Sequence, residues 1–270
     1  MLYFGILKSD TASSALLGSA LEGLAMYAHR INVDFFRDLL AVLRGHVERA
    51  RKASSEYDAR GAMETEGEVK QAPTRRDIRD ALLCLVTAFE LLSGQGEALN
   101  IDLSDMASHL YSIILQISMS PGMEEAPERT TLSANGRKTT HLRSSADLLF
   151  RALELLLLRP RASTVSSERA AAFTKRMLSC CLHWPATSVI RSVRMIKVML
   201  ARDTRLIALF DGEDLARDGK FDPISDNVDA VRPLACGESA WELEMLKKSC
   251  NADIRAEVTH LVAAVADAIK

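Results

Sequence analysis

The chain has 270 residues and a formal net charge of −2, with 34 Lys plus Arg against 36 Asp plus Glu. This balance argues against a strongly basic nucleic-acid binder and leaves room for a local basic face. Glycine and proline contribute 13 and 7 residues, which are too few for the many tight turns of a β-sandwich or barrel. No uninterrupted apolar run of about 18 residues is present, so we expect no membrane partner.

Apolar residues at helical spacing dominate the first half of the chain. The first predicted helix carries Leu17, Leu21, Leu24 and Ala28 at i, i+4, i+7 and i+11. A second predicted helix has Asn32 as its N-cap and an apolar face made of Phe36, Leu39, Leu43 and Val47. Thr74 is the expected cap of a third helix that includes residues 78–92 and stops near Gly94. Ser104 opens a fourth helix, which extends through Ile117.

The same period continues in the second half. Residues 148–158 are apolar nearly all round, which predicts a buried central helix that ends at Pro160. The next helix carries Phe173, Met177 and Cys180 and is terminated by Pro185. Val189, Val193, Ile196 and Leu200 then repeat the i, i+4, i+7, i+11 spacing. A last pair of helices is predicted at residues 241–250 and 254–269, with Asn251 as the cap between them.

No segment alternates with a two-residue period, so the predicted fold class is all-α. The joints at residues 30–32 and 249–251 are short, which makes the helices that they connect antiparallel neighbours. Repeated antiparallel pairs favour a HEAT/armadillo-like antiparallel helical-repeat solenoid over a closed bundle.

Three stretches interrupt the helices and set the predicted domain bounds. Residues 1–52 form a helical segment, residues 53–76 a polar and disordered linker, and residues 77–270 the main helical domain. Within that domain, residues 119–144 are rich in turn formers and are expected to be a mobile loop. Residues 211–239 are acidic but include four large apolar residues, so we expect an ordered segment across the helices; these are Leu215, Phe221, Ile224 and Leu234.

Motifs that carry chemistry are weak throughout the chain. Residues 214–222 begin like a calcium loop, but Ala216 and Ser225 stand where oxygen-rich ligands are needed, so an acidic turn is favoured. Cys180, Cys181 and His183 are too few for a structural zinc site, which favours buried thiols packed as small apolar groups. We find no nucleophile elbow, zinc-protease motif or phosphate loop. The chain is therefore expected to have no catalytic residues, no metal and no cofactor.

One charge pattern and one aromatic residue are candidates for function. On a single helix, Arg191, Arg194, Arg202 and Arg205 would cover an arc of about 80° opposite the apolar seam of residues 189–200. A solvated face, pairing with the acidic residues 211–229, is one explanation, and contact with phosphate groups is the other. Asp203 carries the risk of ending the helix before Arg205. Trp241 is predicted to be a structural anchor against the apolar seam.

Long segments of the chain resemble a known family. They are residues 81–102, residues 183–188, and the acidic run from 211–214 through 233–243. Together these segments resemble the C-terminal part of fungal-type members of the CCAAT-binding-factor domain family. Residues 20–25 and 31–36 fit the part of those proteins that directly precedes the family domain. The resemblance spans nearly the whole chain.

The resemblance implies a nuclear and nucleolar helical-repeat scaffold that acts in assembly of the large (60S) ribosomal subunit. It also implies a heterodimer with nucleolar complex protein 2 on pre-60S particles, and contact with their rRNA. An alternative is a chromatin-bound adaptor that works with replication licensing proteins. A third reading is a helical domain without its interfaces, because the longer N-terminal region of the family and a Lys/Arg-rich import signal are missing. We therefore expect the chain to be part of a longer product.

Overall fold

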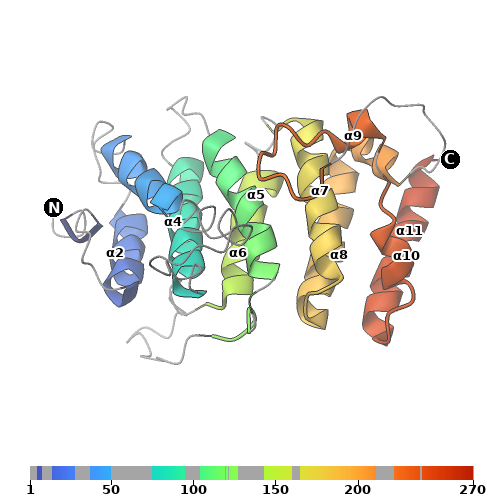
Figure 1. Ribbon diagram of the computed structural model, residues 1–270, viewed down its shortest axis with the longest axis horizontal. Coiled ribbons are helices and arrows are strands. Elements are labelled where there is room, and N and C mark those ends of the chain that lie inside the picture. Colours follow the sequence, from blue (N-terminus) through green and yellow to red (C-terminus); the bar gives the residue numbers. More distant parts are fainter. Residues whose placement is uncertain are drawn as a thin grey trace, which may run out of the picture. The chain divides into compact units, whose positions relative to one another are not determined.

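The computed structural model describes residues 5–7, 14–27, 37–49, 75–94, 104–118, 120, 122–126, 143–159, 165–210, 222–237 and 239–269. Every regular element within these ranges is a helix, which confirms the all-α prediction for this part of the chain (Figure 1). The chain divides into two compact units. Unit 1 comprises Met1–Leu110 and Ser120–Leu155, and unit 2 comprises Tyr111–Met119 and Leu156–Lys270. The predicted helical-repeat solenoid stays a prediction.

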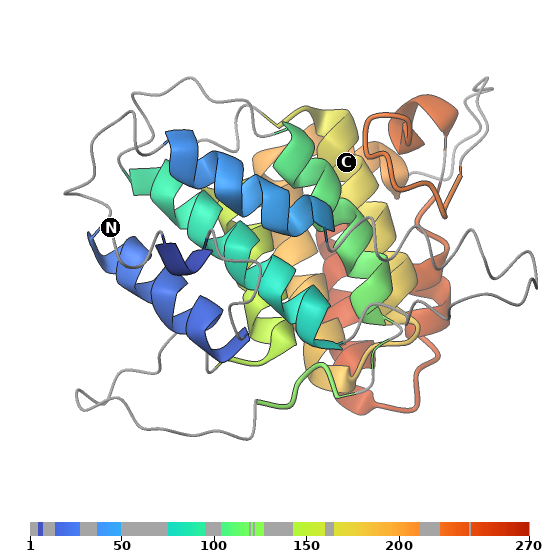
Figure 2. The ribbon, with the colours of Figure 1, turned by 60° about the vertical axis from the view of Figure 1, so that its left-hand side comes forward.

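Unit 1 is built around α4 (Arg75–Gly94), which packs against α2 (Ser14–Tyr27) and α6 (Ser145–Leu153). Figure 2 shows α4 beside α2, with a further helix at residues 37–49. All nine residues from 81 to 89 are buried, so α4 is central to this unit. The predicted stop near Gly94 agrees with the end of α4. Thr74, its predicted cap, lies outside the described residues.

The predicted central helix over residues 148–158 is two elements in the structure. Ser144 caps α6 by accepting a hydrogen bond at Oγ from the backbone N–H of Asp147, at 3.1 Å. The helix then continues as a π-helical turn, η4 (Glu154–Leu158). Leu155, Leu156 and Leu157 are all buried, as predicted for this apolar segment. The backbone, however, changes from α-helical to π-helical winding at Glu154.

The segment at residues 119–144 is better ordered at its start than the predicted mobile loop. Met123 is buried, and its carbonyl oxygen accepts a hydrogen bond from the backbone N–H of Ala146 at 2.9 Å. Gly122 has φ of 69°, a conformation that glycine adopts without strain. Residues 122–126 are thus tied to the start of α6. Residues 53–74 of the predicted linker lie outside the described residues, and the prediction is wrong at residues 75 and 76, which form the start of α4.

Unit 2 is formed by α7 (Ser167–Cys181), α8 (Ala186–Arg202), η6 (Thr204–Leu209), α9 (Pro233–Cys236), α10 (Glu242–Leu246) and α11 (Ala252–Ile269), with the second half of α5 (Ser104–Ser118). Helix α8 packs against both α7 and α11. Its apolar seam is buried as predicted, at Val189, Val193, Ile196 and Leu200. No described helix is long and apolar enough to cross a membrane.

Two helix ends in unit 2 agree with the sequence signals. Asn251 caps α11, because its Oδ1 accepts hydrogen bonds from the backbone N–H groups of Asp253 at 2.8 Å and Ile254 at 3.4 Å. Helix α8 ends at Arg202, and Asp203 then adopts an extended conformation with φ of −128° and ψ of 98°. The break expected at Asp203 is therefore present.

The acidic segment is only partly covered by the structure. Leu215, Phe221 and all but the last residue of the calcium-like loop at 214–222 lie outside the described residues. Ile224, predicted to be an apolar anchor, is instead 74% exposed. Val228 and Val231 are buried in its place, and Arg176 of α7 holds the backbone on both sides of Ile224 through the carbonyl oxygens of Pro223 and Ser225.

Candidate functional site

The charged residues of α8 are all basic. They are Arg191, Arg194, Lys197 and Arg202. Arg194, Lys197 and Arg202 are exposed, and Arg191 is half-buried. Because the opposite side of the helix is the buried apolar seam, α8 presents a basic face that consists of these four residues.

Three of the four predicted phosphate-contacting arginines lie on α8, and the fourth does not. Arg205 belongs to η6, because Asp203 ends α8 and its Oδ1 accepts a hydrogen bond from the backbone N–H of Arg205 at 3.1 Å. The prediction that all four arginines lie along one arc of a single helix is therefore wrong for Arg205. The side chain of Arg205 is exposed, but η6 carries it instead of α8.

The arginines of α8 also have partners inside the protein. Arg194 donates from Nε to Glu257 Oε1 of α11 at 2.8 Å, and Arg202 donates to the carbonyl oxygen of Leu158. Arg191 is not without a partner in the protein either. Among the described residues, the acidic partner of Arg194 comes from α11. Residues 211–221 of the acidic segment, which was considered as a partner of these arginines, lie outside the described part.

Electrostatics at the contact between α8 and α11 follow from this pair. The hydrogen bond from Arg194 lowers the pKa of the Glu257 carboxyl, with further lowering by the charges of Arg194, His260 and Lys197. The same hydrogen bond raises the pKa of Arg194. One carboxylate therefore faces several cationic groups, so an added anion would compete with Glu257 for Arg194.

A second polar cluster lies inside unit 2, between α7 and α10. Lys175 and Glu242 form an ion pair at 2.9 Å, with side chains only 2% and 0% exposed. Lys175 Nζ also donates to the carbonyl oxygen of Ser239 at 2.5 Å, and Ser179 Oγ donates to Glu242 Oε1 at 2.6 Å. Both buried charges are compensated, as a charged pair in a packed interior requires.

Trp241 is not the buried anchor that was predicted from the sequence. Its side chain is 50% exposed, and its ring centroid lies 5.3 Å from Lys175 Nζ. Glu242 and Leu243, which follow it directly, take the inward positions of α10, so the tryptophan covers the ion pair from outside. Met245 is 56% exposed one turn later.

Arg176 fixes the described end of the acidic segment to α7. Its Nη2 donates to the carbonyl oxygens of Pro223 at 3.0 Å and Ser225 at 2.6 Å. The guanidinium also lies 3.9 Å from the centroid of the Tyr111 ring, and Tyr111 packs edge-on against Phe173. The sequence did not single out Lys175 and Arg176. The available signal was that both residues stand in α7 among apolar neighbours that are buried.

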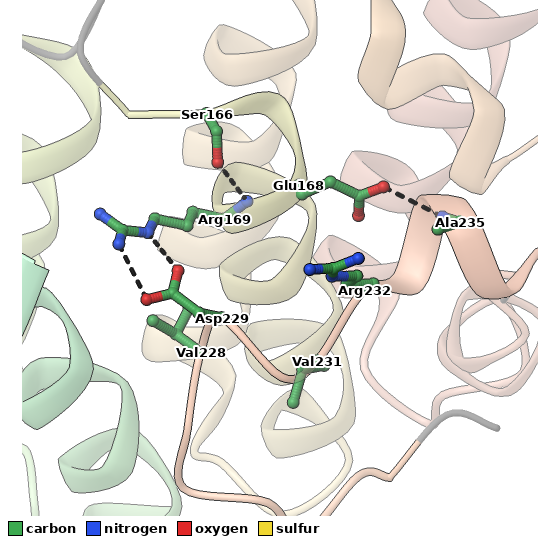
Figure 3. Close-up of a pocket in the computed structure, with 8 residues that line it drawn as sticks. All are labelled: Ser166, Glu168, Arg169, Val228, Asp229, Val231, Arg232 and Ala235. Atoms are coloured by element: carbon green, nitrogen blue, oxygen red, sulfur yellow. Dashed lines mark hydrogen bonds and ion pairs between the residues drawn. The ribbon is translucent and has the colours of Figure 1, made fainter. Parts of the chain in front are cut away.

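A pocket of about 320 Å³ lies between the first turn of α7 and residues 228–235 (Figure 3). Arg169 binds Asp229 with two hydrogen bonds, from Nε at 2.5 Å and from Nη2 at 2.8 Å. Glu168 accepts hydrogen bonds from the backbone N–H groups of Leu234 at 3.3 Å and Ala235 at 3.1 Å. Arg232 is exposed and lies between these two groups in the view of Figure 3.

The cysteines divide into two groups. Cys84, Cys180 and Cys181 are buried, as expected for thiols packed as small apolar groups, whereas Cys236 is half-buried and Cys250 is exposed. Burial raises the pKa of Cys84 and Cys181 to about 12 and that of Cys180 to about 11. The described residues contain no group of three His, Cys, Asp or Glu side chains placed to hold a metal ion.

The packed helices of both units define an all-α protein whose polar clusters join elements far apart in sequence. Residues 81–258, more than half of the chain, match the CBF/Mak21 family. The chain belongs to this family, which confirms the resemblance seen in the sequence.

Several relatives align with almost all of the chain. Nucleolar complex-associated protein 3 of Saccharomyces cerevisiae is 29% identical over 92% of the chain and 34% of its own length. The nucleolar complex protein 3 homolog of Danio rerio is 30% identical over 97% of the chain and 27% of its own length. The homolog of Homo sapiens is 29% identical over 97% of the chain and 26% of its own length. The chain thus spans about a quarter to a third of these relatives. The similar identities do not single out a fungal type.

Proposed function

We propose that the chain is a non-catalytic helical scaffold that acts in the nucleolus in assembly of the large ribosomal subunit. The observation that carries this proposal is the alignment of 92–97% of the chain with relatives that are named nucleolar complex protein 3. Packed helices with charged outer faces suit a protein that holds other molecules in place. The nucleus and nucleolus are the proposed location.

The proposed partners are a protein and an RNA. Nucleolar complex protein 2 is the proposed protein partner, in a heterodimer on pre-60S particles. The rRNA of those particles would meet the basic face of α8, whose charged residues carry no acidic neighbour on the same helix. Arginine suits this role because its planar guanidinium matches the geometry of phosphate oxygens.

Sedimentation of the tagged chain from cell lysates tests the proposal. We expect the chain to migrate with pre-60S particles, to shift to lighter fractions after RNase treatment, and to copurify with nucleolar complex protein 2. A DNase-sensitive association with chromatin would instead support an adaptor for replication licensing. Migration as a free protein in untreated lysate would contradict both.

A further inference from the structure

Helix α10 presents a stripe of exposed side chains on the surface of unit 2. Trp241, Met245 and Lys248 follow one another at i, i+4 and i+7, which places them within an arc of about 60° on a helix. The helical turns continue past α10, because the backbone N–H of Lys248 donates to the carbonyl oxygen of Met245 at 3.0 Å. Trp241 is 50% exposed, Met245 is 56% exposed, and Lys248 is exposed as well. This face therefore offers an accessible apolar surface that ends in a cation.

The opposite side of α10 holds the stripe in a fixed orientation. Glu242 is fully buried in the ion pair with Lys175 and accepts a hydrogen bond from Ser179. Leu243 and Leu246 are buried too, at 4% and 5% exposure. A surface that is fixed before its partner arrives loses little conformational freedom on binding. The exposed positions of α10 are therefore preorganised for a partner.

The charges along the stripe leave one cation without a counterpart. Glu244 and Lys247 form an ion pair with each other. Lys248 forms no ion pair with any residue in the described part of the chain. At the other end, the indole N–H of Trp241 has no hydrogen-bond acceptor among the described residues. Both ends of the stripe thus offer donors, since indole and ammonium groups donate hydrogen bonds and do not accept them.

We propose that this stripe docks an acidic amphipathic helix of a protein partner, with leucine-sized side chains against Trp241 and Met245 and carboxylates on the two donors. Tryptophan is enriched among the residues that dominate binding energy at interfaces, and methionine adapts to varied apolar shapes. A helix supplies the matching spacing, because its own side chains meet a neighbour at i, i+4 and i+7. The proposal does not depend on the nucleolar role.

A protein suits this surface better than a nucleic acid does. Glu244, which directly precedes Met245, has a side chain that is 67% exposed. A phosphate backbone would bring several negative charges close to this carboxylate and meet only one uncompensated cation, Lys248. A helix with one carboxylate at each donor meets less repulsion. Stacking of a base on the Trp241 ring is the competing possibility that the test must exclude.

Fluorescence polarisation with the purified full chain tests the charged part of the proposal. The probe is a fluorescein-labelled peptide with the sequence AEAALLAAEAALLAAEA, in which glutamate and paired leucines recur at heptad spacing. The matched probe carries glutamine in place of every glutamate. Exposed charge pairs are weak, so the glutamate peptide should bind about twofold to fivefold more tightly than the glutamine peptide. Lys248→Gln should remove most of this difference, whereas Lys197→Gln, at an exposed lysine of α8, should keep it.

Substitutions in the stripe test its apolar part. Trp241→Ala should weaken binding of the glutamate peptide at least about thirtyfold, as expected for a tryptophan that dominates an interface. Met245→Asp alters an exposed position that the fold tolerates, and it should weaken binding at least about tenfold. Val198→Ala, at an exposed apolar residue of α8, is the matched control and should bind as the parent chain does. Peptide binding that survives Trp241→Ala and Met245→Asp, or that Val198→Ala also removes, would overturn the proposal.

Iodide quenching of tryptophan fluorescence locates the peptide on the unmodified chain. The chain has two tryptophans, and Trp184 is buried, so a quencher in solution reaches mainly Trp241. Saturating glutamate peptide should lower the quenching by about half or more, because the ring becomes buried in the interface. Absence of peptide binding, equal binding of the two peptides, or unchanged quenching would contradict the proposal. Protection of Trp241 by a uridine oligonucleotide that displaces the peptide would identify a base-stacking surface instead.

Discussion

At the scale of single residues, the buried pair of Lys175 and Glu242 makes a specific prediction about stability. Glu242→Leu leaves the ammonium group of Lys175 buried without its partner, and we expect a loss of about 3–5 kcal/mol in the free energy of unfolding. Replacing both residues, as Lys175→Met with Glu242→Leu, should recover most of this loss because no buried charge remains. Urea unfolding of the three proteins measures both values. A double variant as unstable as the single one would contradict the assignment.

Trp241 and Phe173 provide a matched pair of aromatic substitutions. Trp241 is half exposed, so Trp241→Ala should cost only about 1–2 kcal/mol, from partial burial and the contact with Lys175. Phe173 is fully buried against Tyr111, so Phe173→Ala should cost about 3–5 kcal/mol. Urea denaturation compares the two variants. Equal losses would show that Trp241 is a core residue, as its size alone had suggested.

Thiol reactivity and alkaline stability should follow burial of the cysteines. At neutral pH a maleimide reagent should label Cys250 first and leave Cys84 and Cys181 unmodified until the chain unfolds, as peptide mass spectrometry would show. Their folded-state pKa of about 12 lies above the ordinary value of 9.0. The stability that these protonated thiols contribute is therefore complete below pH 9 and is lost as pH rises toward 12. Fast labelling of either buried thiol in the folded chain would contradict their placement.

At the scale of elements, the sequence predicted positions well and long-range contacts poorly. Helix α8 and the cap at Asn251 were predictable because apolar spacing and capping are local properties. The ion pair of Lys175 and Glu242 was not, since it joins residues 67 positions apart and no local pattern records which helices pack together. Trp241 was misplaced for the same reason: a large aromatic side chain is usually buried, but its neighbour Glu242 takes the inward position here.

The basic face of α8 predicts a gain of function. Glu257→Gln removes the carboxylate that binds Arg194, so Arg194 becomes available for a phosphate group. Binding to rRNA should tighten, and the slope of log affinity against log salt should steepen by about 0.7–0.9, the value for one further contact. Glu244→Gln, on α10, is the matched control.

Loss of positive charge on α8 and on η6, the element that follows it, should have the opposite effect. Lys197→Gln with Arg205→Gln removes two exposed cations, which should reduce the salt slope by about 1.4–1.8 if both contact phosphate. Filter binding across a salt series measures the slope for all variants. If none of them changes it, the basic face is a solvated surface and rRNA binds elsewhere.

Helix α7 should control the order of the segment that crosses it. Arg176→Met removes the donor to Pro223 and Ser225, and hydrogen exchange at the buried Val228 and Val231 should become faster. Arg169→Met breaks the more exposed pair with Asp229 and should have a smaller effect. Exchange rates followed by mass spectrometry distinguish the two. Unchanged rates in Arg176→Met would mean that the apolar contacts of the valines hold the segment without it.

At the scale of the whole molecule, composition constrains function less than the arrangement of charge does. A net charge of −2 argues against a basic protein, yet α8 alone carries four basic residues and no acidic one. The family could be identified from long segments of sequence, because these are specific even at about 30% identity. The surface that serves each partner could not be identified from the sequence, because it depends on side chains such as Trp241, whose exposure only the fold determines.

The last prediction concerns the segments between helices. Residues 53–73 and 128–141 lack the apolar spacing needed to bury surface, so deleting both should shift the thermal midpoint by only a few degrees. The longer deletion of residues 119–144 differs, because it removes the buried Met123 and the cap at Ser144.

Met123→Ala isolates that difference without shortening the chain. It should cost about 2–4 kcal/mol, a fall of at least about 4 °C in the midpoint for a chain of this size. Thermal unfolding followed by circular dichroism compares the two proteins. If the double deletion lowers the midpoint by more than about 8 °C, equivalent to over about 2 kcal/mol, the deleted residues contribute packing that their composition does not reveal. If Met123→Ala melts like the parent chain, the turn at residues 122–126 does not depend on the packing of the Met123 side chain, and its polar contacts, such as the backbone hydrogen bond to Ala146, hold it.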